Sequence, residues 1–136
     1  MSLRSLSLMD LYQRNAVLFP EKSALIDAEQ VFSFHDLVEQ SRALQRGLAA
    51  AGLQPGERIA VLARNSFHFF PLFGAVSALG AILVLINRRL SKEEIRKIMA
   101  DTTSVMLITE RRILETAPEA AAHCPSPTAP FILQHQ

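Results

Sequence analysis

Arg58-Ile59-Ala60-Val61-Leu62-Ala63 is the stretch that decides the fold, because one arginine is followed by five apolar residues in a row. The turn sequence Gln54-Pro55-Gly56-Glu57 precedes it, with proline and glycine where a type II turn prefers them. A short unbroken apolar run is typical of a strand buried on both faces, as in parallel sheets. We therefore predict a buried strand at residues 58–63.

The next segments on the C-terminal side read as a helix and a second strand. Asn65 or Ser66 is expected to cap the helix, whose first turn would hold Pro71 at little cost. Gly80 is expected to end that helix, and the branched apolar run at residues 81–86 predicts the second buried strand.

A further helix and strand complete the pattern. Ser91-Lys92-Glu93-Glu94 is a capping box that opens a helix, and residues 104–109 predict a third strand. Strands and helices that alternate at this spacing predict an α/β fold built on a βαβαβ unit with parallel strands.

The N-terminal third predicts helices that flank this unit and a small β-hairpin. Residues 7–19 read as a short amphipathic helix, and residues 23–27 and 30–33 as two strands joined by a two-residue link. Ser33 with Asp36 forms a second capping box, and the helix that it opens is expected to end at Gly52.

Composition narrows the class of protein. The chain has 136 residues, of which 49% are hydrophobic and 20% charged, so a packed core is expected and disorder is not. A formal net charge of +1 gives no basic field for nucleic acid. The single cysteine, Cys124, excludes a disulfide framework, and the four histidines lack metal-ligand spacing.

The run from Phe67 to Ile86 contains no charged residue and is long enough for a membrane span, which takes about 20 apolar residues. Pro71, Gly74 and Gly80 interrupt it, and its composition changes at Gly80. We favour a helix followed by a buried strand. A small membrane protein that spans at residues 67–86 is the alternative.

The candidate site residues follow from the expected sheet. In open parallel sheets, ligands bind beyond the carboxyl ends of the strands. Asn65, Asn87 and Arg88 stand at such ends, and Thr109 with Glu110 stands at a third. Asn65, Asn87 and Arg88 are therefore the candidate residues facing a substrate or cofactor. The alternative interpretation of Asn65 is a helix cap, and that of Arg88 is a charged residue in a solvent-exposed loop.

Several sequence motifs in this order resemble one family. Phe19-Pro20-Glu21-Lys22-Ser23-Ala24-Leu25 is similar to the motif F-P-x-K-x-A-L, and residues 48–61 to L-x-x-x-G-x-x-x-G-D-x-V-A-V. Asn87-Arg88-Arg89-Leu90 is similar to N-P-R-L, with Arg88 in place of the proline. Over residues 4–112 the chain resembles the N-terminal part of the AMP-forming acyl-CoA synthetases, which are adenylate-forming enzymes.

The resemblance implies a domain organisation. Residues 1–116 would be part of the large N-terminal, AMP-binding domain of an adenylate-forming enzyme. Residues 117–136 would be a Pro/Ala-rich linker that ends in a final strand near residues 131–134.

The resemblance also implies a reaction. The complete enzyme would use ATP, Mg²⁺ and coenzyme A to convert a carboxylic acid, of the fatty-acid class, into an acyl-adenylate and then a thioester. The chain lacks the family's T-S-G-T-T-G-x-P-K, Y-G-x-T-E and T-G-D motifs and the C-terminal domain with its lysine. We therefore expect no catalytic residue, metal ligand or cofactor-binding activity in this chain alone, and a cytoplasmic location.

A different class of function stays open. Half of a parallel sheet would leave a strand edge and apolar surface uncovered, and such surfaces attract partners. A non-catalytic interaction or oligomerisation module that self-associates through this surface is the alternative to an enzyme fragment.

Overall fold

The computed structural model describes residues 6–110 and the backbone of residues 131–133. The chain forms two compact units, which are taken in turn. Unit 1 comprises Met1–Gln54 and Ser66–Gly80, and unit 2 comprises Pro55–Asn65 and Ala81–Gln136. Most of the expected linker, at residues 117–130, lies outside the described residues, as do His123 and Cys124.

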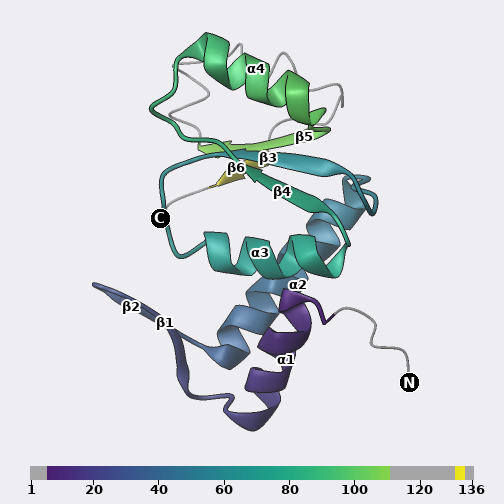
Figure 1. The fold of residues 1–136 in the computed structure, drawn as a ribbon. Helices are drawn as coiled ribbons and strands as arrows, with labels where there is room; N and C mark the ends of the chain where they lie inside the picture. The colour runs from purple at the N-terminus through teal and green to yellow at the C-terminus, as the bar shows by residue number, and fades with distance from the viewer. Residues whose placement is uncertain (1–5, 111–130, 134–136) are drawn as a thin grey trace. The chain divides into compact units, whose positions relative to one another are not determined.

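Unit 1 contains three helices and a hairpin (Figure 1). The helices are α1 (Leu8–Leu18), α2 (Phe34–Ala50) and α3 (Phe69–Ala78). The hairpin strands β1 (Ser23–Asp27) and β2 (Gln30–Ser33) are antiparallel, as predicted, and place Ile26 opposite Val31.

Two helices start at the capping boxes read from the sequence, at Ser33 and at Ser91. In α2, the Asp36 backbone N–H donates to Ser33 Oγ at 3.1 Å, and the Ser33 backbone N–H donates to Asp36 Oδ2 at 3.0 Å. Ser7 and Ser91 make the same reciprocal bonds at the starts of α1 and α4 (Lys92–Thr102). Two of the four backbone N–H groups left open at each helix start therefore have partners.

These bonds also explain the acidity of the capping carboxyl groups. The backbone N–H and then the hydroxyl of the cap serine lower the pKa of Asp36 and of Glu94 below their ordinary values. Both bonds favour the charged carboxylate. The stabilisation is thus present at neutral pH and is lost as the pH falls through the lowered pKa.

The three helices of unit 1 pack closely around a glycine. The backbone N–H of Met9 in α1 donates to Ser77 Oγ in α3, and the Tyr12 hydroxyl donates to the Phe70 carbonyl. A Cβ added to Gly74 in α3 would lie 2.8 Å from Ser41 Oγ and 2.9 Å from Tyr12 Cε2. The absence of a side chain at Gly74 therefore permits the close approach of α1 and α2 to α3.

Unit 2 is a four-stranded sheet with one helix against it. Its strands are β3 (Arg58–Leu62), β4 (Ile82–Leu85), β5 (Met106–Glu110) and β6 (Phe131–Leu133). They lie in the order β4-β3-β5-β6, and all pairs are parallel, as the sequence predicted for the first three. The strand expected near residues 131–134 is confirmed as β6.

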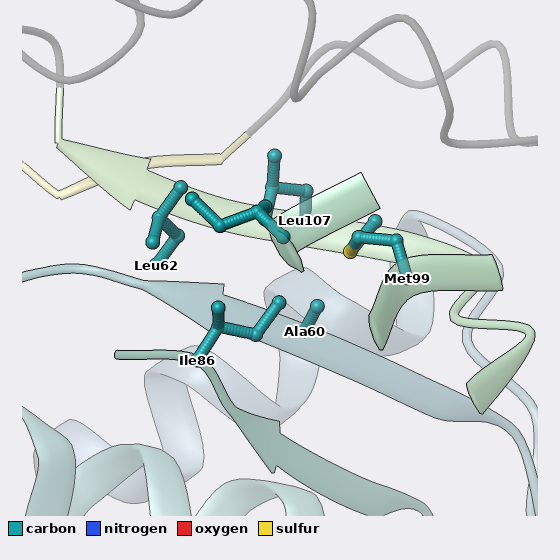
Figure 2. Packing of buried hydrophobic residues seen from close by; sticks show 6 residues of the cluster. Ala60, Leu62, Ile86, Met99 and Leu107 are labelled. Carbon is teal, nitrogen blue, oxygen red and sulfur yellow. The ribbon is translucent and has the colours of Figure 1, made fainter. Parts of the chain in front are cut away.

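The core of unit 2 lies between the sheet and α4. Figure 2 shows Ala60 of β3, Leu107 of β5 and Ile86, which directly follows β4, gathered with Met99 of α4. Leu62 and Ile95 complete this buried cluster. The helical spacing of Ile95 and Met99 and the alternation along the strands place these side chains in one core.

The amino end of β3 is tied to the end of α4. Arg58 Nε donates to the Thr102 carbonyl at 2.7 Å, and its guanidinium also donates to Thr103 Oγ1. Thr103 has a φ of 49°, in the left-handed region, where it ends α4. Arg58 thus satisfies one carbonyl that the helix end leaves open.

The prediction that Asn65 or Ser66 caps α3 is wrong. The helix begins at Phe69, after His68, which makes no side-chain cap bond. The Phe69 N–H donates to the Ser66 carbonyl, and the Phe70 N–H donates to the Phe67 carbonyl. These hydrogen bonds, each from a residue to the one three positions earlier, take up the first N–H groups, so the helix starts later than the polar residues indicate.

The uncharged run from Phe67 to Ile86 is divided as expected. It forms α3 and then β4, with Gly80 at a φ of 66° between them. In the part of the chain that the structure describes, no helix is long and apolar enough to cross a membrane.

A pair of glycine substitutions tests the packing of unit 1. Gly74→Ala should destabilise the chain by about 1–3 kcal/mol, because the new methyl overpacks against Ser41 and Tyr12. Gly47→Ala in α2 has no atom within 4 Å of its new Cβ. It should be neutral or stabilise by up to about 1 kcal/mol, through helix propensity. Urea unfolding followed by circular dichroism measures both. Equal stability of the two variants would contradict the close packing at Gly74.

Candidate functional site

The carboxyl ends of β3, β4 and β5 in unit 2 carry polar residues at one edge of the sheet. Arg64 and Asn65 follow β3, Asn87 and Arg88 follow β4, and Glu110 ends β5. Because the strands are parallel, these ends lie on the same side of the sheet. The three predicted site residues, Asn65, Asn87 and Arg88, therefore share this edge.

Asn87 shapes the turn that follows β4. Its Oδ1 accepts from the backbone N–H of Arg89 at 3.0 Å, and its backbone carbonyl accepts from the N–H of Leu90 at 3.2 Å. An asparagine that bonds to the backbone two residues on is a common turn former. Asn87 is exposed and thus has a structural task besides any contact with a ligand.

Asn65 and Arg88 are exposed at the same edge. Neither makes a side-chain hydrogen bond or ion pair with another residue in the described ranges 6–110 and 131–133. An amide and a guanidinium in this state are open to a ligand, and a guanidinium suits phosphate or carboxylate oxygens.

Glu110 differs from these residues because its carboxylate is buried. Its side chain is only 6% exposed, and it accepts from the backbone N–H of Arg64 at 2.6 Å and from Arg64 Nε at 3.3 Å. The Arg64 side chain is 54% exposed. Glu110 therefore holds the chain where it leaves β3 and is not offered to solvent.

Thr109 performs a similar task one residue earlier. Its hydroxyl donates to the carbonyl of Leu62 at 2.8 Å, and Thr109 is fully buried. Leu62 and Thr109 are also register partners in the β3–β5 ladder. Together Thr109 and Glu110 fix the ends of two strands against each other.

Arg64 is the residue at this edge that the sequence analysis did not select. The signal that could have found it is a cation directly after one predicted strand and a carboxylate at the end of another. Its pairing with Glu110 depends on β5 lying next to β3, which the order of segments along the chain does not reveal.

The edge is suited to binding an anion and not to holding Mg²⁺. Arg64, Arg88 and Arg89 supply cations. The oxygens of Glu110 already accept hydrogen bonds, and Mg²⁺ requires carboxylate oxygens that are accessible. Within residues 6–110, no three His, Cys, Asp or Glu side chains come together as a metal site.

The architecture defines a class: an α/β protein whose parallel strands end at a polar, cationic edge. Comparison with protein families identifies it further. The family model described as AMP-binding enzyme matches residues 12–135. The chain therefore belongs to the AMP-binding enzyme family, the adenylate-forming enzymes, as its motifs indicated.

Named relatives are acyl-CoA ligases. The chain is 35% identical over 101 residues to a 2-succinylbenzoate–CoA ligase of Bacillus cereus. That match covers 74% of this chain and 21% of the relative. The chain thus spans about a fifth of the length of the curated relatives that it matches.

Solved structures show the same fold. A protein of Rhodopseudomonas palustris named as a long-chain-fatty-acid CoA ligase is 28% identical, with a TM-score of 0.80. The match covers 96% of this chain and 36% of that one. The N-terminal domain of FACL13 from Mycobacterium tuberculosis superposes with a TM-score of 0.81 at 24% identity, covering 93% of this chain and 33% of that one. The fold is that of the N-terminal domain of adenylate-forming enzymes.

Substitution of the two partners at the edge should have unequal effects. Glu110→Ala leaves the part-buried N–H of Arg64 without its acceptor and should cost about 1–3 kcal/mol of folding free energy. Arg64→Ala removes a half-exposed side chain but keeps the backbone bond, so it should cost less than about 1 kcal/mol. Urea titration of both variants gives the comparison. Equal costs would show that the side-chain ion pair, and not the backbone bond, holds the edge.

Proposed function

We propose that this chain is the N-terminal part of an ATP-dependent, AMP-forming acyl-CoA ligase. The family match over residues 12–135 carries the proposal, because it covers nearly the whole chain. The match covers only 21% of the B. cereus ligase, which supports the proposal that this chain is part of a longer enzyme. We propose the domain organisation that the sequence indicated, which is an AMP-binding portion at residues 1–116 followed by a linker with a strand at residues 117–136.

The proposed reaction has two steps. The carboxylate of the acid attacks the α-phosphate of ATP, forming an acyl-adenylate and releasing pyrophosphate. The thiol of coenzyme A then attacks the acyl carbon, and AMP leaves. The complete enzyme would use Mg²⁺ to offset phosphate charge in the first step. The acid is proposed to be of the fatty-acid class, and the protein cytoplasmic.

The role proposed for Asn65, Asn87 and Arg88 is contact with substrate or cofactor at the sheet edge. Their place beyond the carboxyl ends of parallel strands supports it, since ligands of open α/β sheets bind there. Arg88 would supply positive charge toward a phosphate or carboxylate. No bond-making role is assigned to them.

A second function, that of an interaction module, has its own supporting observation. Ile82 and Leu85 in β4 are 49% and 56% exposed. Apolar side chains on an edge strand favour association. The third reading, a membrane span at residues 67–86, does not fit a run that is split into a ten-residue helix and a strand.

The 136-residue chain alone should show no adenylation. The chain lacks the Ser/Thr/Gly-rich phosphate loop and the lysine that the reaction needs, so ATP–pyrophosphate exchange should stay at the blank rate. The assay is run with 2-succinylbenzoate and with fatty acids of several lengths.

The positive control is a joined chain. Residues 1–110 of this protein are followed by the part of the B. cereus ligase that lies beyond its matched segment. Acid-dependent exchange by the joined chain supports the proposed function. Exchange by the 136-residue chain alone would contradict its inertness.

Arg88 and its neighbour Arg89 form a matched pair for the proposed site. In the joined chain, Arg88→Ala should raise the KM for ATP or for the acid by about tenfold, the loss expected for one charge-assisted contact. Arg89→Ala, one residue further from β4, should leave both KM values unchanged. A similar effect of the two substitutions, or none from Arg88→Ala, would remove Arg88 from the site.

A further inference from the structure

Arg64, which follows β3, is bound to a buried carboxylate through one side of its guanidinium. Its Nε donates to Glu110 Oε2 at 3.3 Å, and its side chain is 54% exposed. Within residues 6–110 and 131–133, its Nη1 and Nη2 atoms make no hydrogen bond or ion pair. These two terminal nitrogens are donors that an arginine offers to phosphate or carboxylate oxygens. Arg64 therefore keeps an anion-binding group available.

The contact between the two side chains does little for folding. Glu110 already accepts from the Arg64 backbone N–H through its other oxygen, at 2.6 Å. A side-chain ion pair that involves a half-exposed arginine contributes little to stability. The bond to Nε instead restricts the orientations of the guanidinium. A side chain that is held in this way loses less conformational entropy when it binds a ligand.

A second arginine stands level with Arg64 at the end of the neighbouring strand. The last register pair of β3 and β4 is Val61 with Leu85. The same spacing, continued along both segments, sets Arg64 level with Arg88. Arg88 is exposed, and its side chain has no partner in the described part of the chain. Two guanidinium groups of unit 2 thus stand on adjacent strand ends.

The acidic residues that follow Arg88 in the sequence are bound to other groups. Glu94 accepts from the backbone N–H of Ser91 at 2.8 Å in the capping box of α4. Glu93 accepts from Arg96 Nε at 3.0 Å. The positive charge of Arg88 is therefore not committed to the carboxylates that lie closest to it along the chain.

The set of donors indicates the kind of anion. A carboxylate has two oxygens, and one arginine can occupy both of them. A singly esterified phosphate group has three acceptor oxygens and can therefore accept from two guanidinium groups at once. Asn65, directly after Arg64, adds an exposed amide. Two level arginines and an amide fit a phosphate group better than a carboxylate.

We propose that Arg64 and Arg88 together bind a phosphate group, and that Glu110 is a positioning residue that orients Arg64 for this contact. The proposal adds Arg64 to the site and gives Glu110 a task besides the backbone bond. It rests on the proposed function only for the source of the phosphate group, which is ATP or coenzyme A.

Glu110→Gln is the variant that separates positioning from the other effects of this carboxylate. The glutamine carbonyl can still accept from the Arg64 backbone N–H, but its amide nitrogen cannot accept from Arg64 Nε. Removal of a negative charge near a bound anion would by itself tighten binding. Loss of the orientation of Arg64 weakens it. We expect the dissociation constant for inorganic phosphate to rise about tenfold.

Binding is measured on the 136-residue chain by NMR titration at constant ionic strength. The ligands are inorganic phosphate, ATP, coenzyme A and 2-succinylbenzoate, and the backbone N–H and Nε–H signals of Arg64 report on the site. Arg64→Ala and Arg88→Ala should each raise the dissociation constant for phosphate about tenfold. Arg42→Ala removes a similarly exposed arginine, paired with Glu39 in unit 1, and is the matched control that should change nothing. Circular dichroism checks that each variant is folded.

The comparison of ligands and variants decides the proposal. Tighter binding of ATP or of coenzyme A than of inorganic phosphate identifies the source of the phosphate group and supports the site. Binding of inorganic phosphate but of neither cofactor would overturn that source. Unchanged or tighter binding by Glu110→Gln would overturn the positioning role. Full binding by Arg64→Ala, an equal loss in Arg42→Ala, tighter binding of 2-succinylbenzoate than of phosphate, or no binding at all would overturn the site.

The proposed function has a separate readout, the ATP–pyrophosphate exchange of the joined chain. Phosphate binding with the expected variant effects, but without exchange by the joined chain, would contradict the proposed function and support the arginine site. Acid-dependent exchange that is the same in the joined chain with and without Arg64→Ala, together with no phosphate binding, would support the proposed function and overturn the arginine site.

Discussion

The hydrogen bonding of β3 to strands on both of its edges is the constraint on which unit 2 depends. A strand paired on both sides in a parallel sheet needs apolar residues on both faces, and residues 59–62 supply them. Parallel neighbours also require crossover segments, because a tight hairpin joins only antiparallel strands. The long connections that lead from β3 to β4 and from β4 to β5 follow from this requirement.

The same constraint creates the polar edge. Parallel strands end on one side of the sheet, so the residues after β3, β4 and β5 are brought together although they are far apart in the sequence. Some of these residues maintain the edge itself: Thr109 and Glu110 bond to the end of β3, and Asn87 forms the turn after β4. Asn65 and Arg88 stay exposed. This edge is a candidate site because some of its residues hold the strand ends in place while others stay exposed to a ligand.

The length of the chain relative to its named relatives affects how the exposed apolar edge of β4 is interpreted. An apolar, unprotected strand edge is a hazard in a complete small protein. In a chain that spans about a fifth of its named relatives, it is a surface on which further structure can be built.

The sequence by itself determined the local elements. Capping boxes at Ser33 and Ser91, and Gly80 with its positive φ, act through neighbours a few residues away, so the chain pattern alone located these helix boundaries. Apolar runs gave the strands of the parallel sheet, and β3 and β5 are buried as such runs indicate, whereas β4 exposes Ile82 and Leu85. The order of motifs gave the family.

Tertiary structure decided what depends on contacts between distant residues. The order β4-β3-β5-β6 brings Arg64 and Glu110 together, and the order of segments along the chain does not give that arrangement. Likewise, α3 starts at Phe69 and not directly after Asn65 or Ser66, because turns precede the helix. The polar residues did not indicate these turns. Hydrogen bonds and packing between distant segments form only once the strands are paired in the sheet. For this physical reason the sequence located the candidate residues, but it did not show which of them support the sheet edge and which stay exposed.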